Sequence, residues 1–241
     1  MKTSKIILIA FVFCIFAGMI TLFIATKAHE KNIDKDNIKE VIALPPFSVI
    51  VGENGSRFRI ESGKINKLTI SYPGKKTNVP SPFVIKKDTL YIVEKLNTKE
   101  PGRVLQIQCS NVHTIIARHT NDININHFNT NTLKIIADKG ILFLGLEKDG
   151  TASNKANKIS NLTYLAKNRS FLTMQATQID KMKVSLDQST ILLQYKNNIK
   201  SVSAEIKDSS NINVYSGSYN SIQKMDFIAD LTSKYALDKQ D

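Results

Sequence analysis

The chain has 241 residues, of which 42% are hydrophobic, and its 33 Lys and Arg against 21 Asp and Glu give a net charge of +12. This composition supports a folded core and excludes a wholly disordered chain. The two cysteines are too few for a disulfide-rich scaffold or for a zinc site built from four thiolates.

The first predicted element is the uncharged and almost wholly apolar segment 6–26. As a helix, this segment spans roughly 30 Å, which is the hydrocarbon thickness of a bilayer. It is longer than the apolar stretch of a cleavable signal peptide. A cleaved signal peptide and a buried core helix are the alternatives. Because Lys2 and Lys5 precede the segment and a long domain follows, we expect residues 1–26 to form a cytoplasmic tail and a transmembrane anchor. The predicted location is a bacterial inner membrane, crossed once, with the domain in the periplasm or otherwise outside the cytoplasm.

Residues 27–43 mix charges with few apolar positions, which is typical of a juxtamembrane tether. Pro45-Pro46 follows, and residues 44–241 are predicted to form one folded domain. Its first part, 44–112, contains short runs of alternating apolar residues that turn signals such as Asn54-Gly55 and Pro73-Gly74 separate. These runs predict β-strands.

The C-terminal half repeats a pattern of about 20 residues, which is the period of a solenoid. In each unit, apolar residues alternate with polar ones, about five turn-forming residues follow, and a second short strand comes next. The units start at His113, Leu133, Leu162, Met182, Val202 and Met225. Alternation with period 2 is the pattern of strands that bury one face. The sequence therefore predicts an all-β fold, a single-stranded parallel β-helix of about 20-residue coils behind one N-terminal transmembrane helix. A β-sandwich is the alternative.

The repeating frame resembles that of the auto-transporter adhesin head GIN domain of Bacteroidota envelope proteins. The opening segments Phe47-Ser-Val-Ile-Val, Phe58-Arg-Ile-Glu and Lys87-Asp-Thr-Leu-Tyr-Ile are also similar to that family. The resemblance covers roughly residues 44–240, although the turns here lack the glycine-rich signature of the family. It implies a β-rich fold and surface attachment, and no assigned activity.

The chain shows no convincing cofactor, metal or catalytic site. His113, His119 and His127 with Cys109 fall at positions of the frame that diverge, whereas zinc needs converging ligands. Carboxylates in the predicted turns alternate with cations, and the frame places no two of them as the acid and base of a glycosidase. We therefore expect no cofactor and no enzyme activity.

The positive charge does not indicate a nucleic-acid-binding protein, because the lysines are dispersed and no groove of arginines and aromatic residues is visible. Outward apolar positions are more informative, since stacking would join them into two adjacent stripes. These partner-binding candidates are Ile116, Ile136 and Leu165 before the turns, and Leu142, Phe171 and Ile191 after them. The alternative is that other parts of the chain cover these side chains.

Together, these features predict a membrane-anchored β-helix protein that acts as a non-catalytic binding or adhesion-like module of the cell envelope. We expect the membrane, a protein or glycan partner, and a possible second copy of the chain as its contacts. The alternative functions are a self-assembling envelope scaffold and a glycan-processing β-helix enzyme.

Overall fold

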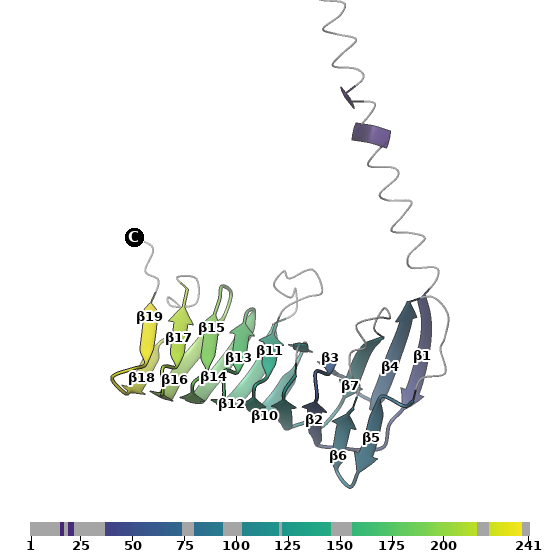
Figure 1. Ribbon diagram of the computed structural model, residues 1–241, viewed down its shortest axis with the longest axis horizontal. Coiled ribbons are helices and arrows are strands. Elements are labelled where there is room, and N and C mark those ends of the chain that lie inside the picture. Colours follow the sequence, from purple (N-terminus) through teal and green to yellow (C-terminus); the bar gives the residue numbers. More distant parts are fainter. Residues whose placement is uncertain are drawn as a thin grey trace, which may run out of the picture.

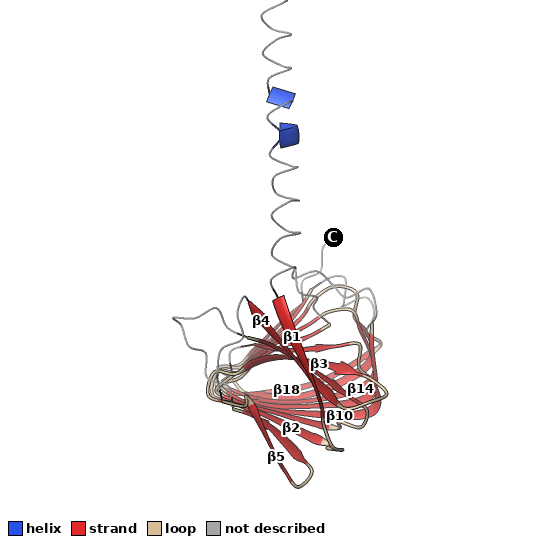
Figure 2. Ribbon diagram, turned by 90° about the vertical axis from the view of Figure 1, so that its right-hand side faces the viewer, coloured by secondary structure: helices blue, strands red, loops and turns tan. Residues whose placement is uncertain are grey.

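The computed structural model describes residues 15–16, 19–21, 37–73, 80–93, 103–120, 122–145, 156–215 and 222–237. Its folded part consists of two large sheets that face each other across one apolar core (Figures 1 and 2). The ten-stranded sheet, named sheet A here, has the order β1-β4-β7-β3-β9-β11-β13-β15-β17-β19. The nine-stranded sheet, sheet B, has the order β18-β16-β14-β12-β10-β8-β2-β6-β5.

The strands of sheet A are β1 (Asn37–Ala43), β3 (Arg57–Ser62), β4 (Lys67–Pro73), β7 (Val104–Cys109), β9 (Asp122–Asn126), β11 (Ile141–Leu144), β13 (Phe171–Met174), β15 (Thr190–Leu193), β17 (Asn211–Val214) and β19 (Lys234–Leu237). Those of sheet B are β2 (Val49–Glu53), β5 (Phe83–Lys86), β6 (Thr89–Ile92), β8 (Thr114–Arg118), β10 (Asn129–Asp138), β12 (Asn157–Lys167), β14 (Thr177–Asp187), β16 (Asn198–Lys207) and β18 (Lys224–Ala229).

The core is built from every second residue of the strands, since successive side chains of a strand point to opposite faces. In sheet B, one inward row consists of Ile115, Ile135, Tyr164, Val184, Ala204 and Phe227, which pair in parallel from strand to strand. All but the last are buried. This row of core residues continues from strand to strand along the long axis of the molecule.

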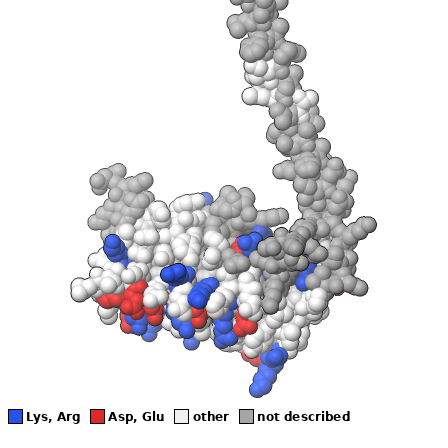
Figure 3. Space-filling model, viewed as in Figure 1, with Lys and Arg blue, Asp and Glu red and all other residues white. Residues whose placement is uncertain are grey.

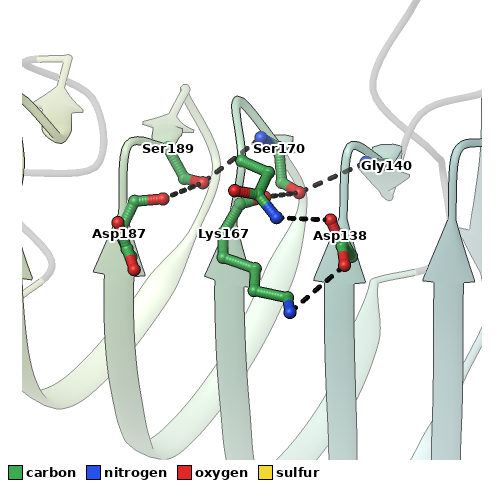
Figure 4. A network of polar contacts seen from close by, with 7 residues as sticks. Asp138, Gly140, Lys167, Ser170, Asp187 and Ser189 are labelled. Carbon is green, nitrogen blue, oxygen red and sulfur yellow. Dashed lines mark hydrogen bonds and ion pairs between the residues drawn. The ribbon is translucent and has the colours of Figure 1, made fainter.

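Serine side chains join the turns between the two sheets (Figure 4). The hydroxyl oxygens of Ser170, Ser189, Ser210 and Ser233 accept the backbone N–H groups of Gly140, Ser170, Ser189 and Ser210 at 3.1–3.2 Å. Beside this ladder, the Lys167 ammonium lies 3.2 Å from the carboxylate of Asp138. The buried turn N–H groups are thus satisfied from the next turn along the stack.

The predicted fold class, one parallel β-helix behind a transmembrane helix, is wrong. Both sheets are mixed, because β1 and β7 are antiparallel to β4, and β5 is antiparallel to β6. The order of strands also departs from the order of the chain, since β3 lies between β7 and β9, and β2 lies between β6 and β8. Alternation of apolar residues is the same in parallel and antiparallel strands, so it could not set their direction. Strand β1 lies in the segment that was predicted as a tether.

The predicted single-pass location in an inner membrane is also overturned. Among the residues that the structure describes, no helix is both long and apolar enough to cross a membrane. Most of the apolar segment 6–26, on which that prediction rested, lies outside the described residues.

Tyr164 places a hydroxyl group in the core, and this group allows a test of the packing. Its side chain is fully buried, and its hydroxyl has no hydrogen-bond partner among the described residues. Because a buried polar group without a partner is costly, we expect Tyr164→Phe to raise the free energy of unfolding by about 1 kcal/mol in urea titrations. The matched substitution of the exposed Tyr195, Tyr195→Phe, should leave it unchanged. A loss of stability in Tyr164→Phe would contradict this account of the core.

Candidate functional site

The candidate site lies on the outer face of sheet A, where β3 runs between β7 and β9. Phe58 and Ile60 of β3 point into the core, so Arg57 and Arg59 point outward. Arg57 is exposed and Arg59 is half-buried. The local sequence Arg-Phe-Arg-Ile thus puts two guanidinium groups on one face, two residues apart.

Strand β9 supplies the acidic and amide groups of the site. Its register places Asp122 opposite Arg57, and Asn124 opposite Arg59. The side-chain nitrogen of Asn124 donates a hydrogen bond of 2.9 Å to Asp122. Arg103, next to the start of β7, donates to the backbone oxygen of Pro80 at 3.2 Å and is the third cation of the site.

The pKa of the Asp122 carboxyl group is subject to opposing effects. Burial raises its pKa, while the charges of Arg57 and Arg59 and the hydrogen bond from Asn124 act in the opposite direction. The side-chain oxygen of Asn124 is buried and has no hydrogen-bond partner among the described residues. Among the described residues, the side chains of Arg57 and Arg59 form no ion pair in direct contact and no hydrogen bond. They act on Asp122 through longer-range electrostatic attraction.

These groups surround a hollow of about 240 Å³, named the arginine pocket here. Its lining residues are Arg57, Phe58, Arg59, Arg103, Val104, Leu105, Asp122 and Asn124. Three cations and one carboxylate leave the pocket positive. A guanidinium group presents a planar fork of donors that matches carboxylate, sulfate and phosphate oxygens, so the pocket can hold an anionic group.

Apolar side chains continue the outer face beside the pocket. Phe143 pairs with Asn124, and Phe171 pairs with Ile141 on the next strand. Phe143 and Phe171 are half-buried, and Ile141 is exposed. A ligand that places an anionic group in the pocket would therefore meet an apolar surface, formed by Ile141, Phe143 and Phe171, along the sheet.

A second and larger hollow, of about 460 Å³, lies on the outer face of sheet B. Its cations are the exposed Lys181, Lys183 and Lys224, and the Lys224 ammonium lies 3.1 Å from the carboxylate of Asp226. On the face drawn in Figure 3, charges of both signs lie side by side along the lower part. Exposed charges of mixed sign interact weakly, so the arginine pocket is the better candidate despite its smaller volume.

The sequence-predicted candidates do not form two adjacent stripes. Ile116, Ile136 and Leu165 are half-buried neighbours on the outer face of sheet B. Phe171 lies on the outer face of sheet A, beside the arginine pocket.

Leu142 and Ile191 must be corrected, because both point into the core and are 0% exposed. The physical reason is the length of the turn. Leu142 follows Asp138 by four residues, whereas Leu172 follows Lys167 by five. In a strand, a difference of one residue moves a side chain to the opposite face.

The cysteine and histidines considered for a metal site stay apart. No group of three or more His, Cys, Asp or Glu side chains in the described part of the chain could hold a metal ion. Cys109 is buried, and this burial raises the pKa of its thiol to about 12.

Sequence reasoning missed the arginine pocket. The available signal was the pair of arginines at alternate positions of a predicted strand. Asp122 and Asn124 lie more than sixty residues further along the chain, and only the order of strands in sheet A brings them to Arg57 and Arg59.

Comparison with solved structures finds proteins of similar fold in Bacteroidota. A crystal structure from Parabacteroides merdae superposes with a TM-score of 0.58 at 12% identity, covering 86% of this chain and 97% of that chain. A second, from Parabacteroides distasonis, has a TM-score of 0.55 at 10% identity, covering 85% and 97%. A third, from Bacteroides fragilis, has a TM-score of 0.51 at 12% identity, with the same coverage. Each of the three proteins is described as a "putative adhesin".

No protein-family model and no curated protein sequence matches the chain. The predicted distant resemblance to Bacteroidota adhesins is confirmed by the solved structures. At 10–12% identity these matches establish a shared fold, and the function must be argued from the site.

Proposed function

We propose that the chain is a non-catalytic binding protein that takes up an anionic group of its ligand in the arginine pocket. The observation that carries the proposal is the pair of outward guanidinium groups of Arg57 and Arg59 beside a half-buried carboxylate. The sheet fixes the backbone positions of both arginines on one face before any ligand arrives, which lowers the entropic cost of binding. The adhesin names of the structural neighbours agree with a binding role.

The ligand that fits this face best is an acidic saccharide. Its carboxylate or sulfate would accept hydrogen bonds from the arginines, and the apolar side of a sugar ring would pack on Phe143 and Phe171. Aromatic side chains offer a large apolar contact area of this kind. An acidic peptide is the competing ligand, and binding experiments can separate the two.

A binding role fits the lining of the pocket better than hydrolysis does. The described lining contains one carboxylate, Asp122, and a glycosidase uses two. Asp122 instead lies beside Arg57 and Arg59, where its negative charge lowers the positive electrostatic potential of the pocket.

The row formed by Ile116, Ile136 and Leu165 stays a proposal of its own. We propose it as a second contact surface for a protein partner, on the sheet opposite the arginine pocket. Replacing Ile136 by Asp should weaken such a contact without changing saccharide binding.

Substitutions in the arginine pocket test the proposed function. We expect Arg59→Ala to weaken binding of a uronic-acid oligosaccharide about 10- to 100-fold in calorimetric titration, because charge-assisted hydrogen bonds are lost. Asp122→Asn removes the negative charge and should strengthen binding. For a sulfated ligand, affinity should rise as the pH falls through the pKa of Asp122, since protonation of Asp122 makes the pocket more positive.

Two controls accompany these titrations. Lys207→Ala removes an exposed cation far from the pocket and should leave affinity unchanged. The same oligosaccharide with its carboxylates reduced to alcohols should bind poorly. Equal affinity of the acidic and neutral oligosaccharides would refute the anionic site, and preference for an acidic peptide would refute the saccharide.

A further inference from the structure

Among the residues that the structure describes, the core is open at its C-terminal end. In β16, the inward residues Val202, Ala204 and Ile206 are 1–3% exposed. Their partners on β18 are Met225, Phe227 and Ala229, of which the first two are only half-buried and the last is exposed.

Strand β19 and the turn before it show the same opening. Tyr235 is 53% exposed, whereas its partner Ile212 on β17 is 1% exposed. Leu231, in the turn before β19, is fully exposed, and Ile228 on the outer face of β18 is 74% exposed. Apolar side chains at the inward positions of an end strand indicate a surface that another strand normally covers.

The opposite end of the molecule is formed by the antiparallel strands β1, β4 and β5 (Figure 1). Its edge strands also leave inward side chains partly uncovered, since Ile42, Phe83 and Ile85 are half-buried and Ile38 is 44% exposed. The two ends differ in strand direction, because both edge strands at the C-terminal end run parallel to their neighbours.

The shape of the open end selects the kind of partner. β18 and β19 are the last strands of the two sheets, and among the described residues neither has a neighbour on its outer edge. A single extended peptide could pair with one of these edges and would leave the other uncovered. A second copy of this chain carries two edges at the same separation.

We propose that two copies of the chain associate tail to tail about a two-fold axis, with β18 pairing antiparallel to its counterpart and β19 to its counterpart. This inference does not depend on the arginine pocket. A two-fold contact uses the same surface on both copies and therefore closes at a dimer.

The contact between Phe227 and Tyr235 fixes the register. Their ring centroids lie 5.2 Å apart across the open core, so an axis that crosses both sheets passes through this pair. Each of the two residues then lies opposite its own counterpart. Four aromatic rings would fill the centre of the interface.

The same register is complementary in size and charge. Met225 comes opposite the partner's Ala229, so that a long side chain packs against a short one. Lys224 comes opposite the partner's Asp230. That carboxylate accepts the backbone N–H groups of Asp208, Thr232 and Ser233, which lower its pKa and keep it charged. Cross-strand pairs of opposite charge stabilise antiparallel strands.

The proposed register places the exposed Ile228 opposite the partner's Asp226. Substituting Ile228 by Asp or by Lys therefore gives two variants that differ in the sign of the charge facing Asp226. With the full chain in mild detergent, light scattering should report a dimer. Ile228→Asp brings like charges together twice and should raise the dissociation constant of the dimer about tenfold or more. Ile228→Lys should keep the dimer. Val84→Asp on β5, the edge strand of sheet B at the opposite end, is the matched control and should also keep it.

Cross-linking tests the register itself. In a Cys14→Ser background, mixing Asp226→Cys chains with Ile228→Cys chains should give a disulfide between the two variants, because these positions face each other. A monomeric parent chain, an Ile228→Asp variant as dimeric as Ile228→Lys, or a dimer that Val84→Asp abolishes would overturn the proposal. A dimer without the mixed disulfide would overturn the register.

Discussion

Replacing Leu186 by aspartate is expected to lower the free energy of unfolding by about 5 kcal/mol, because it buries an unpaired charge. Leu186 is 0% exposed and lies between Ala166 and Ile206 in a second inward row of sheet B, beside the row of Tyr164 and Val184. A loss of this size approaches the total stability of many domains. Circular dichroism should therefore show a largely unfolded chain, or a melting temperature lowered by many degrees.

Lys183→Asp is the matched control, since it places the same aspartate on the same strand. Lys183 is exposed, and its partners on the neighbouring strands are Thr163 and Ser203. Its substitution should change the free energy of unfolding by no more than about 0.5 kcal/mol. If both variants lost the same stability, the assignment of inward and outward faces in β14 would be wrong.

Gly145→Ala is expected to cost about 3 kcal/mol. Gly145 has φ of 84°, a region that an L side chain enters only at a cost of roughly 1–2 kcal/mol. A Cβ atom there would overlap the backbone oxygen of Gln175, which belongs to the next layer and cannot move as a flexible side chain does. Forcing extra atoms into packed structure adds about 1–3 kcal/mol. Urea titration of the purified variant measures the sum.

Gly63→Ala provides the comparison for Gly145→Ala. The three atoms nearest to a Cβ atom at Gly63 belong to the side chain of Gln108, which can rotate away, whereas the backbone of Gln175 cannot. We expect a change below about 1 kcal/mol. A similar loss in both glycine variants would show that the backbone at Gly145 adapts freely, and the close approach of the two layers would have to be revised.

Leu186 and Gly145 differ in what the sequence alone predicts of them. Leu186 lies in a run of alternating apolar residues, so its inward direction follows from period 2 alone. Gly145 follows Leu144 without any sign in the sequence that the backbone of Gln175, thirty residues away, lies against it. Its role comes from the stacking of strands.

Local sequence patterning was sufficient to predict the β character of the chain and the inward side of the long strands. Tyr164, Val184 and Ala204 alternate with polar residues, and local alternation is sufficient to distinguish buried from exposed faces. The sequence also indicated the distant likeness to Bacteroidota adhesins.

The direction and order of the strands, and the site that they form, depend on long-range packing. Pairing direction and strand order are set by contacts between distant segments, so the antiparallel strands β1, β4 and β5 and the place of β3 beside β9 could not be inferred from local alternation. The faces of Leu142 and Ile191 depend on turns one residue shorter than elsewhere. The arginine pocket depends on β9 lying beside β3, because only that neighbourhood joins Asp122 to Arg57 and Arg59.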